Sequence, residues 1–153
     1  NLNSIPYDYV ARQKVGGTHL TFGCIKQLPT FSPDTYDESS LKYIIPRVLK
    51  LTHTSQETCG FALALGQGSE PYSFDLEERL KTICELDAFY AKRYGLNKEE
   101  LRYILDPTEL MGEGYPSETF RILKNKEISL YGEYRTKRLI LEAWDSLEEG
   151  SIQ

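Results

Sequence analysis

The chain has 153 residues, of which 40% are hydrophobic and 27% are charged, as is usual for a single globular domain. Its 18 basic and 23 acidic residues give a net charge of −5, which excludes a nucleic-acid binder that is basic over its whole surface. No apolar run approaches the ~20 residues of a membrane-spanning helix, so we expect no membrane partner.

Residues 1–30 are predicted to form a small β element, the end of a larger β-containing region. Residues 7–12 are rich in aromatic and β-branched side chains, and residues 19–28 form a second extended stretch after the Gly16-Gly17 break. Two short strands are barely stable alone, so we expect them to complete a sheet formed by upstream sequence. Because the first residue is asparagine, we expect a piece of a longer protein or a processed one.

Residues 31–40 are predicted to be a linker, because Pro33 lies there among several turn-forming residues. Residues 41–150 are predicted to form an α-helical domain. Within residues 41–53, Pro46 is expected to open a new helix, because proline fits a first turn better than a helix interior. The expected fold class is therefore mainly α with a small N-terminal β element (α+β), which leads into a helical bundle.

The clearest helix is predicted over residues 75–94. Asp75 followed by Glu78 is typical of a capping box, and apolar side chains recur along one helical face. Asp87 lies on that same face and interrupts its apolar character. Gly95 is expected to close the helix in the left-handed conformation.

A shorter helix is predicted to begin at Asn97, which forms a second capping-box pattern with Glu100. It is expected to end at Leu105, before a loop over residues 106–116. The other expected boundaries are a helix over residues 57–65 closed by Gly66, a helix start at Ser117, a bend or cap at Gly132, and a last helix from Glu133 to about Leu147.

The charge is unevenly distributed along the chain. Residues 54–116 contain 6 basic and 12 acidic residues, whereas residues 117–138 contain 6 basic and 3 acidic ones. Residues 1–30 are also positive, with 3 basic residues against one aspartate. If the chain contacts a polyanion, the field therefore favours these two positive stretches over the acidic middle.

The residues give no pattern for a catalytic, cofactor or metal site. None of the seven prolines precedes another proline, so the Pro-Pro-aromatic loop that adenine methylation requires has no counterpart. Neither the spacing of a glycine-rich cofactor loop nor that of a nuclease metal site is present. His19 and His53 lack a nucleophile at recognisable spacing. The three cysteines are widely spaced without a CxxC pattern, which argues against disulfides or zinc and fits a reducing cytoplasm.

Two stretches carry a family resemblance. Residues 11–29 (ARQKVGGTHLTFGCIKQLP) are similar to the end of the target-recognition region of large bacterial adenine-specific (N6) DNA methyltransferases. These include type II proteins that fuse restriction and modification. Residues 85–96 and 115–145 resemble the C-terminal helical tail of the same proteins.

The resemblance implies a cytoplasmic bacterial parent protein that binds duplex DNA and transfers a methyl group from S-adenosyl-L-methionine to adenine N6. In some proteins of this family the methyltransferase is fused to a type II restriction endonuclease. This segment would then lie next to an upstream methyltransferase domain, and would hold no S-adenosyl-L-methionine itself.

Candidate DNA contacts follow from the two positive stretches. Basic side chains before a flexible turn and backbone N–H groups within it are suited to phosphates. The N-terminal candidates are Arg12, Lys14, Gly16, Gly17, Thr18, His19 and Lys26, and the C-terminal ones are Arg135, Lys137 and Arg138. The alternative hypothesis is an acidic helical module that contacts another subunit or a nuclease domain, favoured by the negative middle of the chain.

Overall fold

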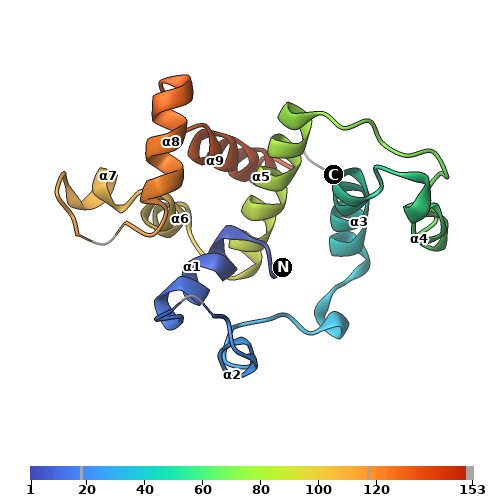
Figure 1. Cartoon of the computed structure of the whole chain (residues 1–153), viewed down its shortest axis with the longest axis horizontal. Helices are drawn as coiled ribbons and strands as arrows, with labels where there is room; N and C mark the ends of the chain where they lie inside the picture. Colours follow the sequence, from blue (N-terminus) through green and yellow to red (C-terminus); the bar gives the residue numbers. More distant parts are fainter. Residues whose placement is uncertain (18, 117, 151–153) are drawn as a thin grey trace.

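The computed structural model describes residues 1–17, 19–116 and 118–150, and the regular secondary structure in this part of the chain consists of helices joined by loops (Figure 1). In chain order the helices are α1 (Ile5–Lys14), α2 (Phe22–Ile25), the 3-10 helix η1 (Pro33–Thr35), α3 (Glu38–Thr52), the 3-10 helix η2 (Gln56–Thr58), α4 (Cys59–Ala64), α5 (Leu76–Arg93), α6 (Lys98–Leu105), α7 (Pro107–Met111), α8 (Arg121–Tyr131) and α9 (Arg135–Glu148). The prediction of a mainly α fold is confirmed.

The predicted N-terminal β element is wrong: the described residues contain no strand. The first expected strand lies inside α1, and the second contains α2. Pro6 fits the first turn of α1, Asp8 lies in that turn, and Lys14 lies in the last one, so the charges follow the helix dipole. In α2, the Thr21 hydroxyl accepts a hydrogen bond from the Cys24 N–H at 3.3 Å and caps the helix.

Pro46 does not open a helix but lies inside α3. The helix begins earlier, within the predicted linker, because the Asp37 side chain accepts a hydrogen bond from the Ser40 N–H at 2.8 Å. The cap therefore sets the start of α3, and the proline is tolerated in its interior.

The helix ends predicted from local patterns are largely confirmed. Asp75 caps α5, and Asn97 and Glu100 form the reciprocal bonds of a capping box at α6. Gly95 and Gly132 have the positive φ angles, both 76°, that favour glycine after a helix. The predicted loop over residues 106–116 instead contains α7, and the predicted cap Ser117 lies outside the described residues.

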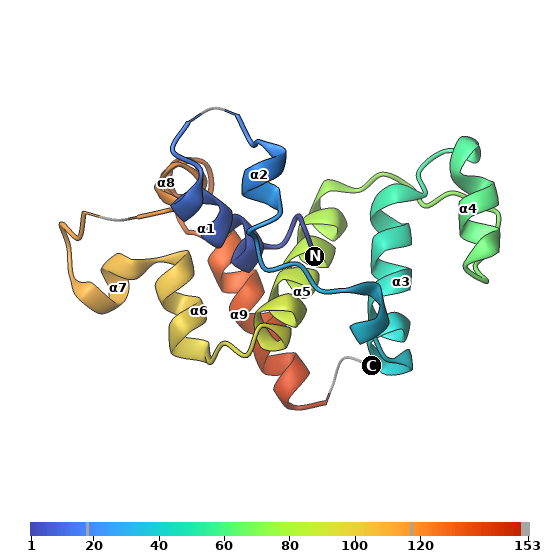
Figure 2. The same ribbon diagram turned by 90° about the horizontal axis from the view of Figure 1, so that it is seen from below.

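The core forms where α5 and α9 pack together, with α1 and α6 against them (Figures 1 and 2). Small side chains on α5 allow this close approach. The buried residues of this core include Cys84, Ala88 and Ala91 of α5, Leu101 and Leu105 of α6, and Ile140, Ala143 and Trp144 of α9.

The other side of α5 carries α3, where the rings of Tyr43 and Phe89 stack with their centroids 4.9 Å apart. Beyond α3, the short α4 lies at one end of the long axis, and α7 and α8 lie toward the other (Figure 1). Among the described residues, no helix has the length and apolar character required to cross a membrane.

Candidate nucleic-acid interface

The three C-terminal candidates are held in ion pairs within the chain. Arg135 pairs with Glu77 of α5 and lies 4.3 Å from the centroid of the Tyr131 ring. Arg138 contacts Glu133 at 3.0 Å and Glu142 at 2.9 Å. Because these acidic partners already balance the cations, this face has little positive charge to offer a phosphate.

Lys137 belongs to a partly buried ion network that joins α6, α7, α8 and α9. It lies 2.6 Å from Glu109 and 3.4 Å from Asp106. Lys124 bonds to Asp106 at 2.8 Å and to Glu118 at 2.8 Å. Burial alone would raise the pKa of Asp106, but hydrogen bonds from Lys124 and Thr108 keep that pKa below its ordinary value. The network therefore holds helices together and is not a reactive centre.

The N-terminal candidates lie on α1, α2 and the segment between them. Arg12 pairs with Asp8 at 2.9 Å, and its guanidinium carbon lies 5.5 Å from the centroid of the Phe120 ring. By contrast, Lys14 and Lys26 are exposed and form no ion pair with any described residue. Their charges are thus available to a ligand.

The backbone candidates of this segment are accessible as well. Gly16 and Gly17 are exposed, and a Cβ added to either would meet no atom within 4 Å. Neither glycine has a positive φ. A ligand would therefore reach their backbone N–H groups because no side chain blocks them, and not because the backbone adopts a left-handed conformation. His19 is also exposed, whereas Thr18 lies outside the described residues.

A contact between α1 and the start of α8 adds a cation that the sequence did not single out. The Gln13 side-chain amide donates a hydrogen bond to the Thr119 hydroxyl at 3.2 Å. This contact brings the end of α1, with Lys14, close to the first residue of α8, Arg121. Arg121 is exposed and has no ion pair within the described part of the chain. In the sequence, Arg121 belongs to the positive stretch of residues 117–138. Its proximity to α1 arises only when the chain folds, so the sequence did not indicate it.

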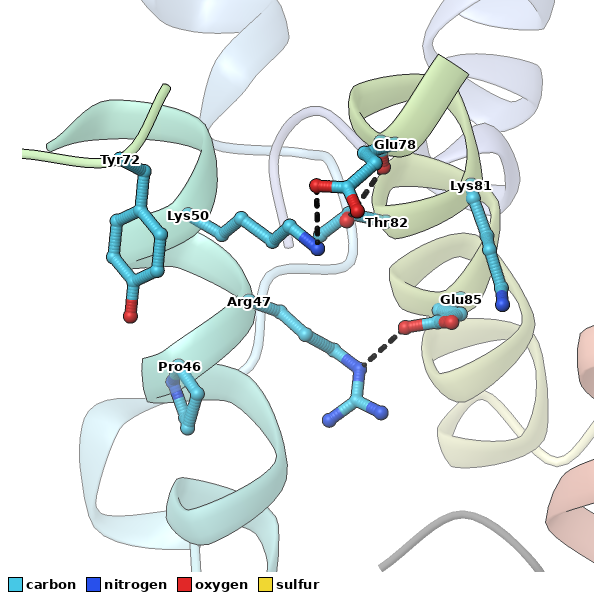
Figure 3. A pocket seen from close by; sticks show the side chains of 8 residues that line it. All are labelled: Pro46, Arg47, Lys50, Tyr72, Glu78, Lys81, Thr82 and Glu85. Atoms are coloured by element: carbon cyan, nitrogen blue, oxygen red, sulfur yellow. Dashed lines mark hydrogen bonds and ion pairs between the residues drawn. The ribbon is translucent and has the colours of Figure 1, made fainter. Parts of the chain in front are cut away.

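A hollow of about 300 Å³ lies between α3 and α5, where Figure 3 shows its charged side chains facing one another. Arg47 bonds to Glu85 at 2.9 Å, and Lys50 bonds to Glu78 at 3.1 Å. Most of the charged side chains that line the hollow therefore neutralise one another. Lys81, at the rim, is an exposed cation outside these pairs. Nothing in this arrangement activates a nucleophile.

A second hollow, of about 420 Å³, lies between the start of α1, α3 and α5, and Asp87 is part of its lining. The Asp87 carboxylate accepts a hydrogen bond from the Ile5 N–H at 2.8 Å. Burial raises the pKa of this carboxyl to about 7. This hydrogen bond joins Asp87 of α5 to the first residue of α1, so the carboxyl group connects the two helices.

The other side chains that could take part in a reaction, His53 and the three cysteines, also have structural roles. His53 is buried, and its Nδ1 lies 2.7 Å from the Thr58 hydroxyl. Cys24, Cys59 and Cys84 are free thiols, and burial raises the pKa of Cys84 far above its ordinary value. Among the residues placed by the structure, no group of three His, Cys, Asp or Glu side chains is arranged to hold a metal ion.

The candidate interface is thus the surface of Lys14, Gly16, Gly17, Lys26 and Arg121, which we call the N-terminal surface. Both views place α1 and α2 near each other around the middle of the long axis, whereas α4 lies at one end (Figures 1 and 2). The family resemblance stays a prediction from the sequence. Comparison of the chain with protein-family models, curated proteins and solved structures found no match.

Proposed function

We propose that the chain is a non-catalytic, DNA-contacting segment of a bacterial adenine-N6 DNA methyltransferase or restriction–modification protein. The observation that carries the DNA contact is the difference between the two basic regions. The C-terminal candidates Arg135, Lys137 and Arg138 are balanced by acidic partners, whereas Lys14, Lys26 and Arg121 of the N-terminal surface are exposed without ion pairs among the described residues.

The N-terminal surface suits the phosphate backbone of duplex DNA better than base edges. Lysine side chains act as mobile point charges, and accessible N–H groups at Gly16 and Gly17 add donors for phosphate oxygens. Contacts of this kind fix the position of a protein on DNA without reading its sequence. Base recognition and methyl transfer from S-adenosyl-L-methionine would belong to the upstream methyltransferase domain of the parent.

The alternative, an acidic module that contacts another subunit or a nuclease domain, is favoured for the middle of the chain by its charge. Residues 54–116 carry 12 acidic and 6 basic residues and would repel a polyanion. The two functions use different parts of the chain and are compatible.

The proposed DNA contact is tested by replacing Lys14 and Lys26 together with alanine. Counterion release makes the logarithm of DNA affinity fall linearly with the logarithm of salt concentration, by about 0.9 for each phosphate contact. We therefore expect the double variant to bind a short duplex more weakly at low salt, with a slope reduced by about 2. Fluorescence anisotropy between roughly 50 and 200 mM salt measures both quantities.

A matched control removes two paired cations, Arg135→Gln with Arg138→Gln, and so loses the same net charge. Its salt slope should stay close to that of the unaltered chain, because both arginines are already neutralised by glutamates. Equal losses in the two variants, or no binding of the unaltered chain at low salt, would contradict the proposed interface. Methyl transfer to DNA by this chain alone would contradict the non-catalytic assignment.

A further inference from the structure

The end of the molecule that holds α4 is acidic. We call residues 54–78 the acidic arm; it comprises η2, α4, the loop after α4 and the first turn of α5. This stretch contains five acidic residues and no lysine or arginine. Figures 1 and 2 both show α4 at the far end of the molecule, with α3 as its neighbour.

The acidic arm also exposes large apolar side chains. Phe61 and Leu63 of α4 are each more than half exposed, as are Phe74 and Leu76 where the loop joins α5. Within α4, Ala62 is the buried residue. Phe61 and Leu63 lie about 100° to either side of the buried Ala62 around the helix, so α4 exposes one large apolar side chain on each flank, which is the pattern of a surface that packs against another molecule.

The negative charge of the arm is only partly balanced. Glu77 pairs with Arg135 and Glu78 pairs with Lys50. Glu57 and Glu70 are exposed and form no ion pair with any residue that the structure describes. Asp75 uses its carboxylate to cap α5, through the Glu78 N–H at 2.8 Å. The arm therefore combines uncovered apolar surface with uncompensated negative charge.

We propose that the acidic arm docks a basic amphipathic helix of a protein partner, with apolar side chains along one face and lysine or arginine along the other. Its apolar side chains would pack on Phe61 and Leu63, and its cations would face Glu57 and Glu70. Such charge complementarity steers the encounter and rejects acidic competitors, nucleic acid included. This inference rests on the alternative function above, for which it names the site and the chemistry of the partner, and it holds with or without DNA.

The test uses the whole 153-residue chain and a fluorescent helical peptide made of leucine and lysine, with a leucine–glutamate peptide of equal length for comparison. We expect the lysine peptide alone to bind. The double change Phe61→Ser with Leu63→Ser should weaken its affinity about tenfold or more, because it removes the apolar anchor. Glu57→Gln with Glu70→Gln leaves the apolar face intact, and should reduce the salt dependence of binding.

The matched control is Ile122→Ser with Leu130→Ser, two exposed apolar residues on α8, and it should leave the affinity unchanged. Circular dichroism checks that each variant folds; the two glutamate changes lie on the exposed surface and keep the test decisive if a serine variant unfolds. Equal loss in the control, equal binding of the glutamate peptide, or binding unaffected by both arm variants overturns the proposal. Self-association that is lost with the Phe61 and Leu63 changes also overturns it, since the occupant would be a second copy.

Discussion

At the residue scale, Asp87 interrupts the apolar face of α5 in the sequence but forms a structural contact in the folded chain. Its place on the apolar face of α5 was visible in the sequence, but its partner was not, because Ile5 lies 82 residues away. Only 3% of Asp87 is exposed, and its carboxylate accepts the N–H of the first residue of α1. A buried carboxyl group without such a donor would be costly, so the contact explains why the residue is tolerated there.

The raised pKa of Asp87 makes stability depend on pH. Between about pH 4 and pH 7 the group is protonated in the folded chain and ionised in the unfolded chain, so folding takes up a proton. The contribution of Asp87 is therefore fully present below about pH 4 and is lost as the pH rises toward 7. Relative to Asp87→Asn, which still offers an acceptor to Ile5 but does not titrate, the unaltered chain should lose roughly 1 kcal/mol per pH unit.

Urea unfolding of both proteins at several pH values across that range measures the difference. Parallel stability curves would show that Asp87 has an ordinary pKa in the folded chain. Curves that diverge with the opposite sign would show that the carboxylate form is the stabilised one.

At the scale of elements, the sequence correctly predicted where several helices begin and end, but it did not predict that the N-terminal segments are helices. The caps at Asp75 and Asn97 and the glycine at position 95 depend on neighbours within a turn, so local patterns suffice. The helices within the first thirty residues are short, and their sequence has aromatic side chains but a weak helical period of apolar residues. In addition, α1 is held in place by the distant Asp87. Their helical state thus depends on tertiary contacts, which explains why the strand prediction was wrong.

Pro46 yields a prediction about α3. In a helix interior, proline removes one backbone hydrogen bond and crowds the preceding turn, at a cost of about 3 kcal/mol in a regular helix. Since Pro46 is exposed, its replacement by alanine loses little packing. We expect Pro46→Ala to raise the free energy of unfolding by more than about 1 kcal/mol, as measured by urea denaturation.

Pro33→Ala is the natural comparison, because Pro33 starts η1 and fits that position. It should leave stability unchanged or slightly lower. If Pro46→Ala destabilises the chain instead, the proline must relieve a strain in α3 or contribute packing to its surface.

At the scale of the whole molecule, the packing is concentrated in the helices around α5 and α9, and α4 lies outside it. The buried residues Cys84, Ala88, Ile140 and Trp144 belong to that core, whereas α4 buries Ala62. The free energy needed to expose a backbone amide therefore differs between the two parts.

Native-state hydrogen exchange should reveal this difference. We expect amides in α5 and α9 to exchange slowest, and those in α4 to exchange faster by about two orders of magnitude or more. Mass spectrometry of peptic fragments from the exchanged chain compares the regions directly. Similar protection of α4 and α9 would show that the arm unfolds only with the core.

The charge arrangement illustrates what a sequence can and cannot disclose about a binding surface. Counting identified two positive stretches, but it could not show which of their cations are paired within the chain. The pairing of Arg135 with Glu77 joins residues 58 positions apart, and it removes Arg135 from the cations that are free to bind a ligand. The approach of Arg121 to the end of α1 likewise depends on the contact between Gln13 and Thr119.

The separation of the N-terminal surface from the acidic arm gives the folded chain an electric dipole. A polyanion that repels the net charge of −5 at long range would still exert a torque on this dipole and turn the lysines toward itself. The rotation acts within about one Debye length, roughly 10 Å at 0.1 M salt. The chain would thus meet the nucleic acid already oriented, with the arm directed outward and accessible to a third molecule.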